Sequence, residues 1–200
     1  MNKIGIMGGT FNPIHYGHLF LAENAYEQAG LDKVLFMPSK NPPHKAKPSL
    51  VTEQQRVEMI KLAIDNNPHF ELSDLELQRE GFTFTADTLE ELVKEQPDTQ
   101  FYFIVGADSL FMMQNWYKPQ LVFRNCIVLA AGRDHSGQTR MCEQINYLEH
   151  TFQAKIMYIQ MPTIQIASAQ IRERLQGGCS VRYYITDAVN EYIIRNHLYI

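Results

Sequence analysis

Cysteine is scarce in this 200-residue chain, and long apolar runs are missing from it. The three cysteines, Cys126, Cys142 and Cys179, lie far apart and form no CxxC pair. We therefore expect free thiols in a reducing compartment, not disulfides or a zinc site. No apolar run reaches the ~18 residues that cross a bilayer, and no charged-then-apolar leader opens the chain. The expected protein is cytoplasmic and has no membrane contact.

The sequence also lacks the signatures of two large classes of nucleotide-binding protein. GxGxxG does not occur, and the expected second strand ends in Met37-Pro38-Ser39, without the acid that holds a ribose hydroxyl in dehydrogenases. GxxxxGK followed by Ser or Thr does not occur either, so a P-loop enzyme is not expected. The formal net charge of −4 argues against a general nucleic-acid-binding surface.

What is present is an alternation of strand-like and helical segments. Short apolar runs that predict strands occur at residues 3–7, 33–37, 70–75, 101–105, 126–130 and 155–160. Near-continuous apolar strands that alternate with helices predict a parallel sheet covered on both faces. Two hundred residues are ample for one core. We therefore expect a single Rossmann-like α/β domain over residues 1–200.

Helices are predicted from apolar periodicity and from capping signals. After the first strand, Leu19, Ala22, Tyr26 and Ala29 share one helical face. A capping-box signature, Thr52 with Gln55, starts a second helix. Further helices are expected around Leu89 and over residues 138–148, 168–175 and 186–197.

The most informative stretch is GGTFNPIHYGH, residues 8–18, between the first strand and the first helix. Small residues let the backbone approach a phosphate, and a helix N-terminus offers free N–H groups and the positive end of a dipole. His15 and His18 lie at i and i+3, on one side of the first turn, and Gly17 would clear space for a phosphate. The pattern predicts phosphate contact by imidazoles. Half of a metal site and a purely structural role for both histidines are the alternatives.

Two more segments carry residues that suit anions. A proline-stiffened basic loop, residues 38–48, contains His44 and Lys45 and begins where the second strand ends. Ligands bind beyond the carboxyl ends of strands in open parallel sheets, so this loop is a candidate clamp; a solvated basic loop is the alternative. Ser168 is expected to be the N-cap of a helix, with Arg172 one turn on to grip nucleotide phosphates. The alternative is an ordinary capped helix with an exposed arginine.

Two strand ends and one aromatic pair complete the candidates. Asp108 follows the strand at 101–105, where a carboxylate can accept ribose hydroxyls or can merely cap the next helix. Trp116 and Tyr117 would supply a stacking wall for an aromatic ring, with core packing as the alternative for Trp116. Arg133 follows the strand that ends near Ala130.

Together these motifs resemble a known family. HxGH after a GGTFNP turn is similar to the nucleotidylyltransferase superfamily, which includes the class I aminoacyl-tRNA synthetases. The chain is far too short for a synthetase and has no KMSKS-like motif. Within the superfamily it most resembles the bacterial nicotinate-nucleotide adenylyltransferases, through GGTFNPIHYGH at 8–18, PPHK at 42–45, FTADTL at 84–89, GADS at 106–109, WY at 116–117 and residues 166–172. In the last element Ala167 and Ala169 replace two hydroxyls of the family's ISSTxIR pattern.

The resemblance implies transfer of AMP from ATP to nicotinate mononucleotide, which gives deamido-NAD and pyrophosphate in NAD biosynthesis. The nucleophile is then the substrate's own phosphate, so catalysis consists of positioning and charge stabilisation. His15, His18 and Arg172 are the expected catalytic residues. Mg²⁺ would accompany ATP and be held mainly by phosphate oxygens and water, and no metal ligands are expected from the protein.

The remaining candidates divide between the two substrates. The residues assigned to ATP are Gly8, Gly9, Thr10, Phe11, Gly106, Asp108, Arg133 and Ser168. The residues assigned to the nicotinate substrate are Asn12, His44, Lys45, Thr85, Trp116 and Tyr117. The resemblance implies that the nicotinate ring lies near Trp116 and Tyr117, with its carboxylate near Thr85.

Other functions stay open at this point. The acceptor could be nicotinamide mononucleotide or phosphopantetheine. A non-catalytic nucleotide-binding regulator and a metal-dependent phosphohydrolase are alternatives from other classes. An aromatic face on the last helix, with Tyr192 and Tyr199 expected to be exposed, allows a homodimer.

Overall fold

The fold is given by a computed structural model that describes residues 1–40, 51–132, 134–162 and 164–200, with residues 134–138 described as backbone only. Its elements, in chain order, are β1 (Asn2–Gly9), α1 (Tyr16–Ala29), β2 (Lys33–Pro38), α2 (Glu53–Ile64), β3 (Phe70–Leu72), α3 (Leu75–Gln78), α4 (Thr85–Glu95), β4 (Thr99–Gly106), α5 (Ala107–Met112), a 3₁₀ turn (Met113–Asn115), α6 (Pro119–Asn125), β5 (Ile127–Gly132), α7 (Asp134–Phe152), β6 (Ile156–Gln160), α8 (Ser168–Gln176) and α9 (Asp187–Arg195).

The strands form one parallel sheet in the order β3-β2-β1-β4-β5-β6. The chain starts in the middle, builds outward through β2 and β3, and then returns to place β4 on the other side of β1. Connections on the two sides of β1 therefore leave in opposite directions, and in open parallel sheets such a point is where ligands bind, in the crevice beyond the carboxyl ends of the strands, here those of β1 and β4. The predicted Rossmann-like α/β class is confirmed.

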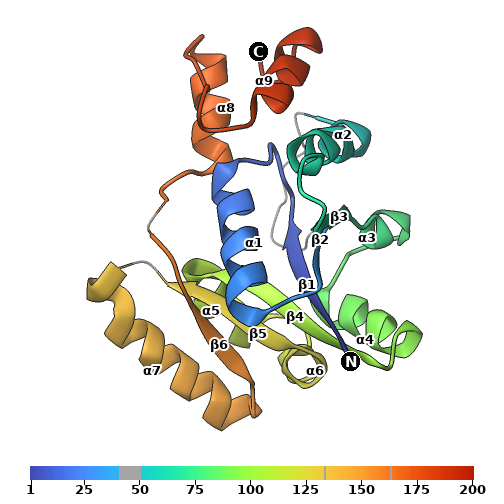
Figure 1. Cartoon of the computed structure of the whole chain (residues 1–200), viewed down its shortest axis with the longest axis vertical. Helices are drawn as coiled ribbons and strands as arrows, with labels where there is room; N and C mark the ends of the chain where they lie inside the picture. The colour runs from blue at the N-terminus through green and yellow to red at the C-terminus, as the bar shows by residue number, and fades with distance from the viewer. Residues whose placement is uncertain (41–50, 133, 163) are drawn as a thin grey trace.

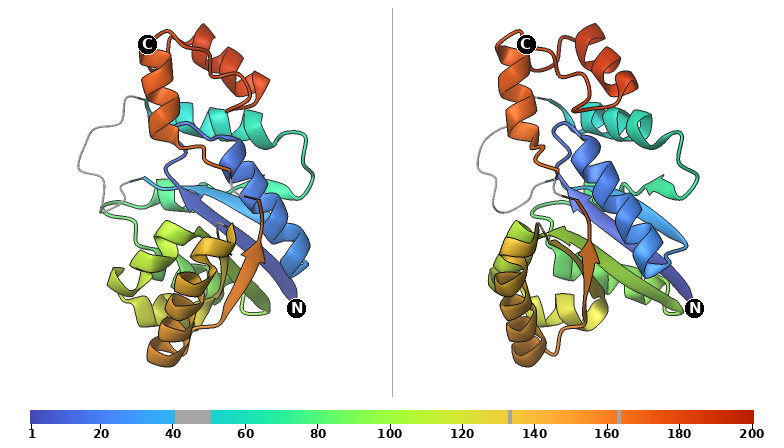
Figure 2. Two further views of the ribbon diagram at one scale, coloured as in Figure 1. Left: turned by 90° about the vertical axis from the view of Figure 1, so that its left-hand side faces the viewer. Right: turned by 60° about the vertical axis from the view of Figure 1, so that its left-hand side comes forward.

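Helices cover both faces of the sheet. On one face the core is built with α1, α2, α8 and α9, and on the other with α4 to α7. Figure 1 and Figure 2 show α8 and α9 stacked with α2 at the end of the molecule to which the strands point. The C-terminal helices thus lie beside the crevice, and segments from both ends of the chain can build one site.

Most predicted elements are confirmed, and the differences have local causes. The Thr52–Gln55 capping box is present, with the Gln55 N–H donating to Thr52 Oγ1 at 3.2 Å. The strand expected at 70–75 stops at Leu72, because the chain turns at Asp74 and the Leu77 N–H donates to the Asp74 carbonyl at 2.8 Å. The short helices α3, α5 and α6 were not predicted, since fewer than eight residues show no clear periodicity. In the described part of the chain no helix has the length and apolar character to span a membrane.

Candidate active site

The glycine-rich turn after β1 lies next to the end of β4. The two strands pair in register, with Ile6 opposite Phe103, so three residues further along each strand come Gly9 and Gly106. Asp108 follows in the first turn of α5 and is exposed. The structure therefore brings together the two strand ends that the sequence assigned to ATP.

Aromatic rings lie close to the backbone at both glycines of the turn. A Cβ on Gly8 would lie 3.4 Å from the Phe103 ring, and one on Gly9 would lie 3.2 Å from the ring of Phe11. Phe11 itself has a positive φ of 46° and is only 1% exposed. Its ring meets His18 edge-on, with centroids 5.0 Å apart. The side chain of Phe11 is part of the core, so the contact with ATP predicted for this residue is left to its backbone.

His15 and His18 form a stacked pair at the start of α1. Their ring centroids are 3.7 Å apart, and His15 occupies the N-cap position. The His15 N–H donates to His18 Nδ1 at 3.3 Å. Because Nδ1 of His18 accepts this bond, its ring proton lies on Nε2, which becomes the donor.

His15 occupies the space beside Gly17 that the sequence assigned to a phosphate. A Cβ on Gly17 would lie 3.0 Å from Nδ1 of His15. The space that Gly17 leaves open is therefore filled by the imidazole of His15, whereas the sequence predicted a phosphate there. His15 is 7% exposed, and its buried Nδ1 has no hydrogen-bond partner among the described residues. Burial lowers the pKa of His15 to about 4, so the ring is neutral at pH 7.

Helix α8, the second-last helix of the chain, is joined to the same turn by two side chains. Arg172 donates through Nη1 to the Asn12 carbonyl at 2.7 Å, and the Ser168 hydroxyl donates to the Pro13 carbonyl at 2.9 Å. The expected N-cap role of Ser168 is wrong: the N-cap is Ala167, and Ser168 is the first helical residue. Its hydroxyl is used for the contact between α8 and the turn.

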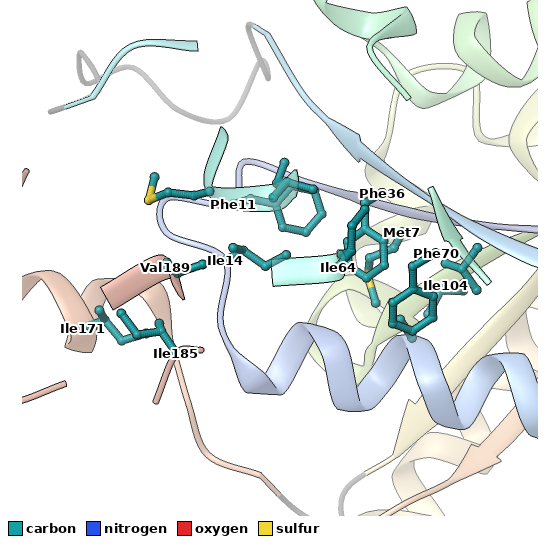
Figure 3. Close-up of a cluster of buried hydrophobic side chains, with 14 of the residues drawn as sticks. Met7, Phe11, Ile14, Phe36, Ile64, Phe70, Ile104, Ile171, Ile185 and Val189 are labelled. Atoms are coloured by element: carbon teal, nitrogen blue, oxygen red, sulfur yellow. The ribbon is translucent and has the colours of Figure 1, made fainter. Parts of the chain in front are cut away.

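Tyr199, near the C-terminus, closes the turn from the other side. Its hydroxyl donates to Asn12 Oδ1 at 2.5 Å, and its ring is 5% exposed. The expected exposed aromatic face is therefore wrong for Tyr199, which is buried and lies beyond the end of α9 at Arg195. Tyr192 is half-buried against the core. Figure 3 shows the apolar part of this contact, with Ile14 of the turn beside Val189 of α9.

Sequence reasoning missed a second arginine at the turn, Arg56 of α2. It is 5% exposed and donates through Nη1 to the Thr10 carbonyl at 2.9 Å. The available signal was its position in the helix: Arg56 shares the apolar stripe of α2 with Met59 and Ile60, both fully buried. A lone arginine in an apolar stripe needs a polar partner elsewhere in the fold.

The residues assigned to the nicotinate ring come together on the other side of the sheet end. Tyr117 is exposed and its ring lies 4.3 Å from that of Phe84, which precedes Thr85 at the start of α4. Trp116 is half-buried and meets Phe103 edge-on, with centroids 5.9 Å apart. Phe103 also lies beside Gly8, so these aromatic rings continue from the glycine turn. One side of Trp116 is used for core packing, as the alternative interpretation expected.

A buried polar network supports the start of α4. Thr88 accepts from Nη1 of Arg79 at 2.9 Å and donates to Oε1 of Glu76 at 2.9 Å. Burial raises the pKa of Glu76, and its contacts with Thr88 and Arg79 offset part of that effect. The network joins α3 to the helix whose first residue is Thr85. Three predicted site residues, His44, Lys45 and Arg133, lie outside the residues described in full.

Comparisons with known proteins bear on this arrangement. The family model described as cytidylyltransferase-like matches residues 6–174. A probable nicotinate-nucleotide adenylyltransferase of Lachnoclostridium phytofermentans is 48% identical over 200 residues, which cover 100% of both chains. Another, of Carboxydothermus hydrogenoformans, is 39% identical over 197 residues and 98% of each chain.

A solved structure shares the fold. It is that of Plasmodium falciparum nicotinic acid mononucleotide adenylyltransferase complexed with NaAD, with a TM-score of 0.82 and 21% identity. The alignment covers 100% of this chain and 98% of that one. At this identity the likeness supports the architecture, and the sequence relatives support the finer relationship.

Proposed function

Because the chain belongs to the nicotinate-nucleotide adenylyltransferases, within the cytidylyltransferase-like family, we propose that it transfers AMP from ATP to nicotinate mononucleotide. The products are deamido-NAD and pyrophosphate, and the enzyme serves NAD biosynthesis. The observation that carries the proposal is the convergence of His15, His18 and Arg172 on one turn at the strand ends. That turn is where an open parallel sheet binds its ligand.

The reaction needs stabilisation of charge more than it needs a base. An oxygen of the acceptor's phosphate attacks the α-phosphorus of ATP, and the bond to the bridging oxygen breaks with its electron pair leaving on pyrophosphate. The acceptor is already anionic at pH 7, so the protein's task is to position the groups and stabilise the charge that builds on the α-phosphate. His18, with its proton on Nε2, suits a fixed donor to an α-phosphate oxygen. Neutral His15 stacks on His18 and keeps its ring in place.

Arg172 supplies positive charge at the same turn. Its guanidinium is half-buried, with one Nη1 bond to the Asn12 carbonyl. An arginine has five N–H donors, so this bond fixes the side chain and leaves donors for the β- and γ-phosphates. We assign ATP contacts also to the backbone of residues 8–11 and to Gly106, Asp108, Arg133 and Ser168.

The acceptor lies on the aromatic side of the crevice in this proposal. Tyr117 and Trp116 would hold the nicotinate ring, with Thr85 near its carboxylate. Asn12, His44 and Lys45 are proposed contacts for the rest of the nucleotide. The amide of Asn12 is already oriented by its bond from Tyr199, which supports a positioning role for it.

Magnesium is proposed to arrive with ATP. Mg²⁺ dehydrates reluctantly and usually keeps several waters beside substrate phosphates, so we propose that phosphate oxygens and water hold it. Mg²⁺ would neutralise charge on the triphosphate. The homodimer and the cytoplasmic location stay predictions. The buried position of Tyr199 removes one of the two residues on which the predicted dimer surface was based.

The reaction is tested with ATP labelled at the α-phosphorus. With nicotinate mononucleotide and Mg²⁺, the label is expected in a dinucleotide, with one pyrophosphate released for each one formed. Label recovered as free AMP would indicate a hydrolase, and binding of ATP without transfer would indicate the regulator; either result contradicts the proposal. His150→Ala, an exposed histidine of α7, is a matched control for substitutions of site histidines.

A further inference from the structure

Arg56 is a buried cation that forms no ion pair with any described carboxylate. Among the described side chains no Asp or Glu forms an ion pair with it, and its bond to the Thr10 carbonyl involves a neutral acceptor. Residues 41–50, which follow β2, contain no acid. Burial of arginine without an anionic partner is unfavourable and therefore rare.

Nearby groups compensate for this charge only in part. Burial lowers the pKa of Arg56, and the exposed Glu53 and the Tyr199 phenol partly oppose the effect. The second guanidinium of the site, Arg172, also acts on Tyr199. Two arginines thus flank the turn at residues 10–12, one bonded to the Thr10 carbonyl and the other to the Asn12 carbonyl. The turn carries excess positive charge before any substrate binds.

We propose that Arg56 is a positioning residue for the triphosphate of ATP, because its buried charge attracts the phosphate chain to the turn and its bond holds Thr10. The proposal rests on the proposed function, since it assumes that a nucleoside triphosphate occupies this turn. Because its side chain is almost fully buried, Arg56 acts on the phosphates through its electric field and through its bond to the Thr10 carbonyl, without direct contact. Weak screening by water at a buried position keeps its electrostatic effect large.

An arginine with this role has an unusual thermodynamic signature. Without nucleotide, its charge has no ion-pair partner among the described side chains and its one bond is to a neutral carbonyl, so an apolar residue of similar length should not destabilise the fold. With nucleotide, the same replacement should weaken binding. A merely structural arginine would show the opposite: its loss would lower the unfolding midpoint and leave the affinity of the remaining folded protein unchanged.

The test compares Arg56→Met, Arg56→Lys and the exposed-surface control Arg124→Met, which removes the same formal charge from α6. Calorimetry measures the Kd of an ATP analogue with a methylene bridge between the α- and β-phosphates, and thermal unfolding is followed without nucleotide. We expect Arg56→Met to raise Kd about tenfold or more with an unfolding midpoint no lower than wild type. Arg56→Lys should weaken binding less than Arg56→Met because a lysine also carries a positive charge on a long side chain, and Arg124→Met should match wild type.

Several results would overturn the inference. One is an Arg56→Met protein that binds the analogue like wild type. Another is an Arg56→Met protein that unfolds at a lower temperature than wild type or fails to fold. A third is an Arg56→Lys protein that binds the analogue as weakly as Arg56→Met does. The last would show that a positive charge at this position does not attract the phosphate chain. If the wild-type protein binds no analogue, both this inference and the proposed function fail. If it binds the analogue and only the variants behave differently from expectation, the function stands without Arg56.

Discussion

Two histidines of identical chemistry have different environments in this site. His15 is buried, neutral at pH 7 and packed against Gly17, whereas His18 is half-buried and has its tautomer fixed by the His15 backbone. The i, i+3 spacing predicts that the rings lie together, and they stack. The spacing could not predict which histidine is buried and which is accessible, because that depends on which ring the surrounding core covers.

His18→Ala should lower kcat by roughly 100- to 1,000-fold, the usual cost of one preorganised donor to a transition-state oxyanion. The fold should be retained, since the ring is only half-buried. Steady-state kinetics with saturating ATP and nicotinate mononucleotide measure the effect, beside the His150→Ala control. A His18→Ala enzyme with nearly wild-type kcat would remove His18 from the catalytic residues.

The buried His15 should make stability depend on pH. Its pKa falls from the ordinary value of 6.5 to about 4 in the folded protein, so between these values the unfolded chain binds a proton that the folded protein does not. The free energy of unfolding should therefore be highest above about pH 6.5 and fall by up to about 3 kcal/mol toward pH 4. Urea unfolding across this range measures it. In His15→Gln this part of the slope should vanish; an unchanged slope would refute the assignment.

At the scale of elements, a polar network anchors the first turn of α4. Glu76, Arg79 and Thr88 connect α3 to α4 beneath Phe84 and Thr85. Local patterns predicted α4 but not this anchor. Elements with a continuous signal were predicted well: the apolar run of β4 and the Thr52–Gln55 capping box each involve neighbouring residues.

Thr88→Val should destabilise the protein and loosen the acceptor side. The change keeps the shape of the side chain but removes the bonds to Glu76 and Arg79, which should cost roughly 2 kcal/mol in the free energy of unfolding. The KM for nicotinate mononucleotide should rise more than the KM for ATP, because Thr85 begins the same helix. Thr88→Ser, which keeps the hydroxyl, is the control. Equal changes in both KM values would show that this network does not position the residues that bind the acceptor.

At the scale of the whole molecule, the site is closed by segments far apart in the sequence. The Arg56–Thr10, Ser168–Pro13 and Tyr199–Asn12 bonds span 46, 155 and 187 residues. No local pattern reports such pairs, which is why Ser168 was expected to be a cap and Tyr199 to be exposed. The sequence could predict the sheet, most of its helices and the two histidines, because each depends on short-range periodicity or spacing. The supports behind the turn depend on the tertiary fold.

Tyr199→Phe tests this closure. Loss of the hydroxyl should remove the bond that orients Asn12, lower the free energy of unfolding by about 1 kcal/mol and reduce kcat/KM by roughly tenfold through misplacement of the turn. The exposed Tyr183→Phe removes the same atom from the surface and should change neither quantity. A Tyr199→Phe enzyme with wild-type kcat/KM would show that the C-terminus does not position the site.

The activity proposed for this chain is transfer of AMP to the nicotinate nucleotide. It is tested most directly by pyrophosphate release from MgATP with nicotinate mononucleotide, nicotinamide mononucleotide and phosphopantetheine as parallel acceptors. We predict a kcat/KM for the nicotinate form at least roughly 100-fold above the others, equivalent to about 2.7 kcal/mol. Equal or greater turnover with another acceptor would contradict the assigned substrate pocket, and no release with any of the three would contradict the reaction itself.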